Sequence, residues 1–158
     1  MQIRVFSATA SGPTPLAAFD RALQAGGTHD TNLIVLSSVV PEGASVVRGT
    51  AAPGEFRTGD RLFCVMAEQR VSEPGAEAWA GLGWATDTAG RGGLFVEAHG
   101  HSEQQVRFDL EQTLEAIVAD RPYWTVGDRD LEVAGTMCEG QPACALVMAI
   151  YESAPWST

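Results

Sequence analysis

The sequence predicts a single α+β domain, and three observations support this class. A chain of 158 residues with 45% hydrophobic residues is long enough to bury one core but short for two. Most segments show the apolar runs or the alternation typical of strands, whereas two segments show helical periodicity. No internal repeat, low-complexity tract or linker divides the chain, so one domain spanning residues 1–158 is expected.

The chain begins with a predicted strand over residues 1–6, where apolar and polar positions alternate. A helix should follow, because Thr14 can serve as its N-cap and Pro15 suits a first helical position that needs no N–H. Gly26 and Gly27 should end this helix. Its apolar stripe consists of Leu16, Phe19 and Leu23.

Strands dominate the middle of the chain. The continuous apolar run 33–36 is typical of a strand that is covered on both faces. Residues 46–47 are a short strand candidate, and residues 61–67 a buried one. Residues 78–85 and 93–98 are predicted to form a hairpin, with the intervening residues as its turn.

A second helix is predicted after the capping-box pattern at residues 102–105. Its apolar stripe consists of Val106, Leu110, Leu114, Ile117 and Val118. Phe108 lies off this stripe, and Pro122 stops the helix. A short strand at residues 131–134 and a long apolar strand at residues 143–151 complete the prediction.

Composition excludes several classes of partner. The formal net charge of −10 argues against binding to nucleic acid or an anionic membrane, whereas an acidic field attracts cations. No apolar run is long enough to span a membrane, and the start lacks a signal peptide, so a cytoplasmic protein is expected. Cys64, Cys138 and Cys144 have no C-x-x-C spacing and are predicted to be reduced core thiols.

A pair of adjacent serines offers unusual chemistry. All ten basic residues are arginines, so no lysine can hold pyridoxal phosphate. If the Ser38 hydroxyl attacks the carbonyl carbon of Ser37, the peptide bond becomes an ester. Elimination of that ester leaves dehydroalanine, which hydrolyses to a pyruvoyl group. For an arbitrary serine pair, a turn whose hydroxyls cap nearby backbone groups is the commoner interpretation.

Three blocks around this pair make the chain similar to the pyruvoyl-dependent arginine decarboxylase family. Residues 14–23 resemble the family's T-P-L-x-A-F-D-x-A-L, and residues 32–41 resemble N-L-I-x-x-S-S-x-x-P. The third block comprises residues 93–97, like G-L-x-x-E, and residues 144–151, like C-A-x-A-x-A-L-W. The resemblance implies a layered αββα-type sandwich. It also implies a trimer of processed chain pairs, with active sites between neighbouring chains.

The resemblance also assigns roles in self-cleavage. It implies cleavage into residues 1–37 and 38–158, so that Ser37 becomes a new carboxyl terminus and Ser38 becomes the pyruvoyl group. Ser37 is also expected among the substrate-binding residues. Asn32 matches an asparagine of the family block, and its amide can donate to the developing oxyanion.

Asp20 and Leu16 are the other predicted substrate-binding residues. They lie one helical turn apart, so their side chains point the same way. The resemblance implies that Asp20 holds the guanidinium of arginine, for which a carboxylate is a bidentate partner, while Leu16 lines the aliphatic part of the pocket. The alternative is a solvated carboxylate on an amphipathic helix, for which Arg21 and Arg48 are candidate partners.

Glu97 is the predicted proton donor. It ends the apolar run 93–96, so it is either a surface group or a partly buried acid with a raised pKa, and the resemblance favours burial. A neutral acid there can protonate the carbon that loses its carboxylate.

A metal site is a weaker alternative for this region. Glu97, His99, His101 and Glu103 alternate, and an extended strand would place them on one face. Ser102 should start a helix that breaks the alternation, and the proposed chemistry needs no metal.

The sequence therefore predicts a self-processing decarboxylase that converts L-arginine to agmatine and CO₂. The reaction would pass through a Schiff base with a pyruvoyl group derived from Ser38, without pyridoxal phosphate or metal. Two alternatives stay open: the same chemistry on another amino acid, and a non-catalytic, unprocessed assembly or binding subunit with this fold.

Overall fold

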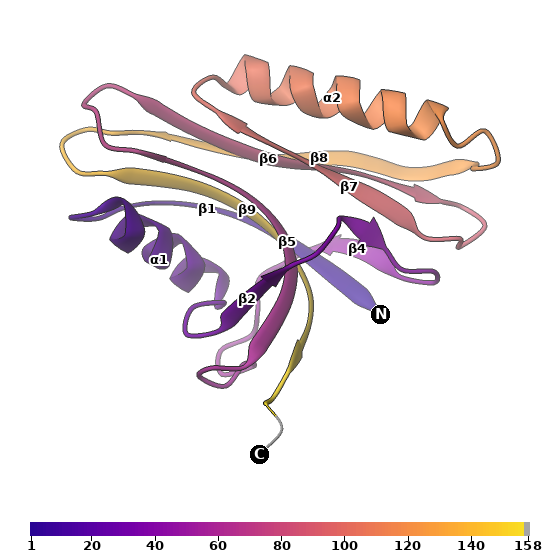
Figure 1. Cartoon of the computed structure of the whole chain (residues 1–158), viewed down its shortest axis with the longest axis horizontal. Helices are drawn as coiled ribbons and strands as arrows, with labels where there is room; N and C mark the ends of the chain where they lie inside the picture. The colour runs from indigo at the N-terminus through magenta and orange to yellow at the C-terminus, as the bar shows by residue number, and fades with distance from the viewer. Residues whose placement is uncertain (157–158) are drawn as a thin grey trace.

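A computed structural model describes residues 1–156 and shows two β-sheets packed face to face, with one helix on the outer face of each (Figure 1). This arrangement confirms the predicted αββα sandwich. The elements in chain order are β1 Gln2–Ser11, α1 Pro15–Gly26, β2 Asn32–Val35, β3 Val39–Val40, β4 Ser45–Arg48, β5 Arg61–Val71, β6 Glu77–Asp87, β7 Gly93–Gly100, α2 Glu103–Ala119, β8 Val126–Met137 and β9 Ala143–Ala154.

The strands β2 and β3 follow one another in the chain but lie in different sheets. The five-stranded sheet has the order β2-β5-β9-β1-β4, and the four-stranded sheet has the order β3-β7-β6-β8. β2 pairs in parallel with β5, and β3 pairs antiparallel with β7. The chain therefore leaves one sheet and joins the other between Val35 and Val39.

The core has three apolar layers. Ile3, Val65 and Leu82 belong to the layer between the sheets. A second layer lies between α1 and the five-stranded sheet, and a third lies between α2 and the four-stranded sheet. Full burial of such side chains stabilises the fold by about 1.5–3 kcal/mol each. The three cysteines are buried and free, as predicted, and burial raises the pKa of the Cys64 thiol to about 11.

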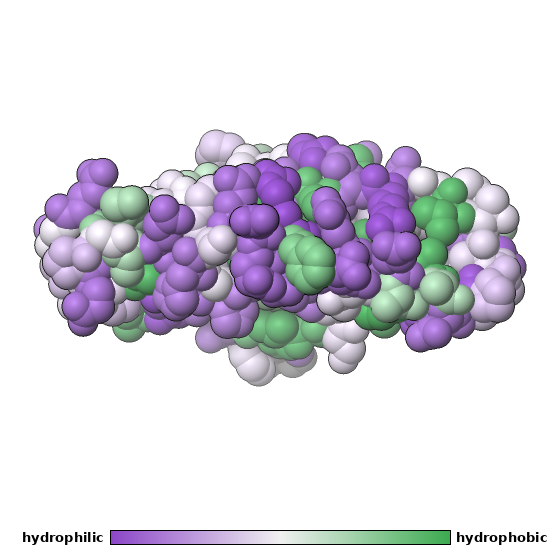
Figure 2. Space-filling view, turned by 90° about the horizontal axis from the view of Figure 1, so that it is seen from above, coloured by the Kyte–Doolittle hydropathy of each residue, from purple (hydrophilic) through white to green (hydrophobic). Residues whose placement is uncertain are grey.

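Both helices begin at the predicted caps. The Thr14 hydroxyl accepts the Ala17 N–H at 3.1 Å, and the Ser102 hydroxyl accepts the Gln105 N–H at 3.4 Å. Only half of the second capping box forms, because the Gln105 side chain donates to Asp109 instead. The outer face over α2 is mostly hydrophilic (Figure 2), although Phe108, off the apolar stripe as predicted, is 56% exposed. No helix among residues 1–156 is both long and apolar enough to cross a bilayer.

Two strand predictions were wrong in detail. The strand at residues 33–36 is not covered on both faces: it is the edge strand β2, and Val35 is 57% exposed. The strand expected at residues 131–134 extends over the whole of β8, because it pairs with β6 from Glu77 opposite Met137 onwards. The two-residue strand β3 was not predicted, because only its pairing with β7 defines it.

The sheet edges opposite β2 and β3 are joined by ion pairs. Arg48, at the end of β4, contacts Asp130 at 2.7 Å and Glu132 at 2.9 Å, both on β8. Glu132 also accepts the Ser7 hydroxyl at 2.6 Å. These contacts tie the two sheets together away from the serine pair.

Asp87 should make stability depend on pH. Its buried carboxylate accepts the Arg91 guanidinium at 2.7 Å and the Thr125 N–H at 2.8 Å, and these bonds lower its pKa to about 2. An aspartate in the unfolded chain has a pKa near 3.9, so this contribution is complete above about pH 4 and is lost towards pH 2. Asp87→Asn should lower the Tm at pH 7 but not at pH 2, whereas Asp128→Asn, on an exposed residue, should change neither. An equal Tm difference at both pH values would contradict this role.

Candidate active site

The serine pair lies in the segment that crosses between the two sheets. The Leu36 N–H donates to the Cys64 carbonyl of β5 at 2.9 Å, which anchors the segment to the five-stranded sheet. The Phe95 N–H of β7 donates to the Ser38 carbonyl at 2.7 Å, which anchors it to the four-stranded sheet. Ser37 is therefore the single residue between the two anchors, and the bond between the serines is held at both ends.

Ser38 has a strained backbone at this junction. Its φ of 64° lies in the left-handed region, which among the non-glycine residues of 1–156 only Asp30 shares. Such a conformation costs about 1–3 kcal/mol and persists only where surrounding contacts impose it. The Ser38 hydroxyl donates a hydrogen bond to Oε1 of Glu97. The structure thus brings together the predicted nucleophile and the predicted acid.

Glu97 itself differs from the expectation of burial. It lies on β7 and is exposed to solvent within the single chain, so the prediction of a buried acid is wrong at the level of one chain. Within residues 1–156, the neighbour of β7 on that edge is β3, and its two residues pair with Leu94 and Gly93, short of Glu97.

Two glycines at the start of β7 allow close approaches, Gly92 to the β3 segment and Gly93 to β6. A Cβ on Gly92, whose φ is 92°, would lie 2.5 Å from the Val40 carbonyl oxygen. A Cβ on Gly93 would lie 2.4 Å from the Ala85 carbonyl oxygen. Real Cβ atoms do not come so close, so side chains here would move the strand that carries Glu97 relative to Ser38.

Tyr151 adds a contact that the sequence did not assign. Its hydroxyl donates to the Val39 carbonyl at 2.9 Å, from β9 of one sheet to β3 of the other. Burial, and then the nearby charge of Glu97, raise the pKa of Tyr151 far above its usual value. Tyr151 lies in one of the family-like blocks, but only the packing of the two sheets shows which backbone group it reaches.

Asp20 and Leu16 share a hollow on α1, as predicted. The hollow measures about 460 Å³ and is lined by Thr14, Leu16, Ala17, Phe19, Asp20 and Leu23. Asp20 accepts the Gln24 side chain at 2.7 Å. It does not pair with Arg21, which donates to a backbone carbonyl, or with Arg48, which pairs with β8. The suggested ion pair is therefore wrong, whereas Asp20 is exposed in the single chain, as the alternative of a solvated carboxylate requires.

Asn32 does not contact the serine pair within one chain. It is the first residue of β2, and Val35 is the last. At about 3.3 Å per strand residue, Asn32 lies roughly 10 Å from Val35, and Ser37 follows two residues later. The Asn32 side-chain amide donates to the Gly59 carbonyl at 2.7 Å. Among the described residues, no hydrogen bond connects Asp20 or Asn32 to Ser38.

The alternating acids and histidines have separate partners. His99 bonds the Gln69 side chain at 2.8 Å, and His101 bonds the Glu77 carbonyl at 2.9 Å. Ser102 starts α2, as expected. Within residues 1–156, no three His, Cys, Asp or Glu side chains gather as a metal site would require.

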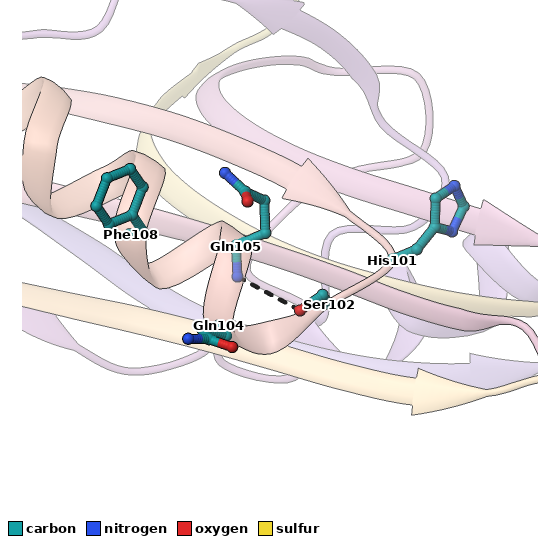
Figure 3. A pocket seen from close by; sticks show the side chains of 5 residues that line it. All are labelled: His101, Ser102, Gln104, Gln105 and Phe108. Atoms are coloured by element: carbon teal, nitrogen blue, oxygen red, sulfur yellow. Dashed lines mark hydrogen bonds between the residues drawn. The ribbon is translucent and has the colours of Figure 1, made fainter.

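An open hollow of about 680 Å³ lies at the start of α2, away from the serine pair. It is lined by His101, Ser102, Gln104, Gln105 and Phe108. The side chains point in different directions around the first turns of the helix (Figure 3). They do not converge on a common point, so this hollow offers no catalytic arrangement.

Comparison with known proteins shows the family of the chain. The family model described as pyruvoyl-dependent arginine decarboxylase matches residues 2–154. A protein of that name from Halobacterium salinarum is 32% identical over 95% of this chain and 93% of its own length. One from Thermococcus kodakarensis is 29% identical over 91% of this chain and 90% of its own length. A solved pyruvoyl-dependent histidine decarboxylase is more distant, with 20% identity and a TM-score of 0.44 over 66% of this chain and 54% of that chain. The family match covers nearly the whole chain, and the chain belongs to the pyruvoyl-dependent arginine decarboxylase family.

Proposed function

We propose that the chain cuts itself between Ser37 and Ser38 and then decarboxylates L-arginine to agmatine and CO₂. One observation carries this proposal: Ser38, strained at the sheet crossover, directs its hydroxyl at Glu97. The names of the related proteins, which are arginine decarboxylases, support the choice of substrate.

The contacts of Ser38 suit self-cleavage. Glu97 accepts the Ser38 hydroxyl and so orients Oγ for attack on the carbonyl carbon of Ser37, and the hydroxyl proton passes to the departing Ser38 nitrogen. The bond from that carbon to the Ser38 nitrogen breaks, and an ester forms. Elimination then removes the Cα proton of residue 38, breaks its Cβ–Oγ bond and releases Ser37 as a carboxylate. The dehydroalanine that remains takes up one water and loses ammonia, which leaves the pyruvoyl carbonyl. Backbone strain at Ser38 favours this rearrangement, because cutting relieves it.

The same contacts fit a pyruvoyl group at position 38. When formed, that group supplies a carbonyl that takes up the electron pair left by the departing CO₂. The Phe95 N–H donates to the carbonyl of residue 38 and can stabilise negative charge that develops on it. Glu97 would return a proton to the reacting carbon.

A trimer with active sites between neighbouring chains is part of this proposal. Asp20 and Asn32 lie away from Ser38 in one chain, so a shared site would need them from a neighbour. Exposed apolar side chains also surround the serine pair and the α1 hollow, with Leu16 65% and Val39 63% exposed. Burial of such side chains favours association.

Incubation of the purified protein with carboxyl-labelled amino acids tests the proposal. Labelled CO₂ should appear from arginine, with agmatine as the other product. Release from a neutral amino acid but not from arginine would support the same chemistry on another substrate. An intact chain that releases no CO₂ from any amino acid would support a non-catalytic subunit.

Asp20→Asn should reduce kcat/KM for arginine by about 30- to 1000-fold, because the guanidinium loses a charge-assisted bidentate contact. Self-cleavage should be unchanged, since Asp20 does not contact Ser38. An unchanged kcat/KM would remove Asp20 from the substrate site.

Mixed assemblies can show whether Asp20 and Glu97 of one site come from different chains. Asp20→Asn and Glu97→Gln proteins, each nearly inactive alone, should recover part of the activity when expressed together. Recovery requires a site in which the intact Asp20 comes from the Glu97→Gln chain and the intact Glu97 comes from the Asp20→Asn chain. No recovery in mixed trimers would contradict the shared site.

A further inference from the structure

The strand that follows the serine pair is short, and of its two residues Val40 is buried in the core between the sheets whereas Val39 is 63% exposed. β3 contains only Val39 and Val40, which pair with two residues of β7. In the uncut chain, the covalent bond to Ser37 also restrains this strand. On the proposed function, cutting removes that restraint and makes residue 38 the first residue of a new chain. The Phe95 N–H on the carbonyl of residue 38 and the buried Val40 then hold the new end, and a further contact beside the cut would fix it against Glu97.

Tyr151 makes the contact best placed to do so. Its hydroxyl donates to the Val39 carbonyl at 2.9 Å, one residue beyond the reactive position. The side chain is only 7% exposed, and its ring lies 6.3 Å from the ring of Phe95. Phe95 in turn lies 6.1 Å from the Trp84 ring and holds the Ser38 carbonyl through its N–H. The donor is therefore fixed by packing before the chain is cut.

We infer that Tyr151 is a positioning residue, which holds the new amino-terminal end at residues 38–40 against Glu97 after self-cleavage. It acts through the Val39 carbonyl, so it touches neither the substrate nor the reacting atoms. β9 belongs to the five-stranded sheet and β3 to the four-stranded sheet. The hydrogen bond from Tyr151 to Val39 therefore still joins the two sheets at this point after the peptide bond between Ser37 and Ser38 is cut.

A direct role for Tyr151 in proton transfer does not fit the same geometry. The hydroxyl proton already lies in the hydrogen bond to Val39, and Glu97 faces the reactive residue instead. Burial keeps the phenol protonated at neutral pH, because it raises the pKa of Tyr151. The hydroxyl therefore remains a donor over the range in which the enzyme would be assayed.

Tyr151→Phe tests the inference, because it removes the hydroxyl and keeps the buried ring. The variant should still cut itself, and its kcat, normalised to pyruvoyl content, should fall about 3- to 30-fold, as expected when a part-buried carbonyl loses a hydrogen-bond donor. KM for arginine should stay within about two-fold, because Tyr151 does not contact substrate. The chain's other tyrosine provides a matched control: Tyr123 is exposed, and Tyr123→Phe should change neither constant.

Hydrogen exchange separates positioning from a general loss of stability. The Tyr151→Phe substitution is made in two backgrounds, the processed protein and the uncut Ser38→Ala protein. It should speed amide exchange in the peptide at residues 38–42 more in the processed protein than in the uncut protein. Equal acceleration in both, or a normalised kcat within two-fold of wild type, would overturn the inference. A wild-type chain that never cuts would refute the proposed function instead. If wild-type protein stays uncut and Tyr151→Phe still speeds exchange at its residues 38–42, the tyrosine holds this segment independently of cutting, and the inference would be overturned as well.

Discussion

Ser38→Ala protein should remain one chain and release no CO₂ from arginine, whereas wild-type protein should separate into fragments 1–37 and 38–158. The variant lacks the oxygen that attacks Ser37 and the atoms from which the carbonyl would form. Intact-mass spectrometry under denaturing conditions measures both fragments, and the second should have no free amino group at its start. The expected effect is complete loss, because no other residue can supply the group.

Ser37→Ala is the matched control for this change. It removes the neighbouring hydroxyl but keeps the carbonyl carbon that Ser38 attacks, so cutting should continue. Ser38→Cys should cut slowly, because a thiol can also attack that carbonyl. A wild-type chain that stays intact during prolonged incubation, or a Ser38→Ala chain that is cut, would refute the assignment of Ser38.

Glu97→Gln should lower kcat by about 10²- to 10⁴-fold with little change in substrate binding. Glutamine retains an oxygen that can accept the Ser38 hydroxyl, so the chain should still be cut, but an amide cannot deliver the proton that the reacting carbon needs. Mass spectrometry should establish complete processing before kcat and KM are measured.

A surface acid controls for the loss of charge in Glu97→Gln. Glu111 lies on α2, away from Ser38, and Glu111→Gln should leave kcat and processing unchanged. A fully processed Glu97→Gln protein that keeps more than about a tenth of the wild-type kcat would exclude Glu97 as the proton donor.

Local features of the sequence determined the elements that carry the site. The helix caps at Thr14 and Ser102 were predicted correctly, because a cap depends on a side chain and a backbone N–H only three residues away. The hairpin of β6 and β7 was also predicted, since its strands are adjacent in the chain. Asp20 and Leu16 share a hollow as expected, because one helical turn separates them.

The tertiary structure alone decided how these elements meet. The bond between Ser38 and Glu97 spans 59 residues, and the bond between Tyr151 and Val39 spans 112. No periodicity shows that β2 is an exposed edge strand or that the chain changes sheets at the serine pair. Strand pairing between distant segments sets both, and it also leaves Glu97 exposed in one chain. The sequence therefore predicted the serine pair, Glu97 and their local elements, whereas packing of the two sheets decided the strain at Ser38 and its contacts, because those depend on groups that only folding brings together.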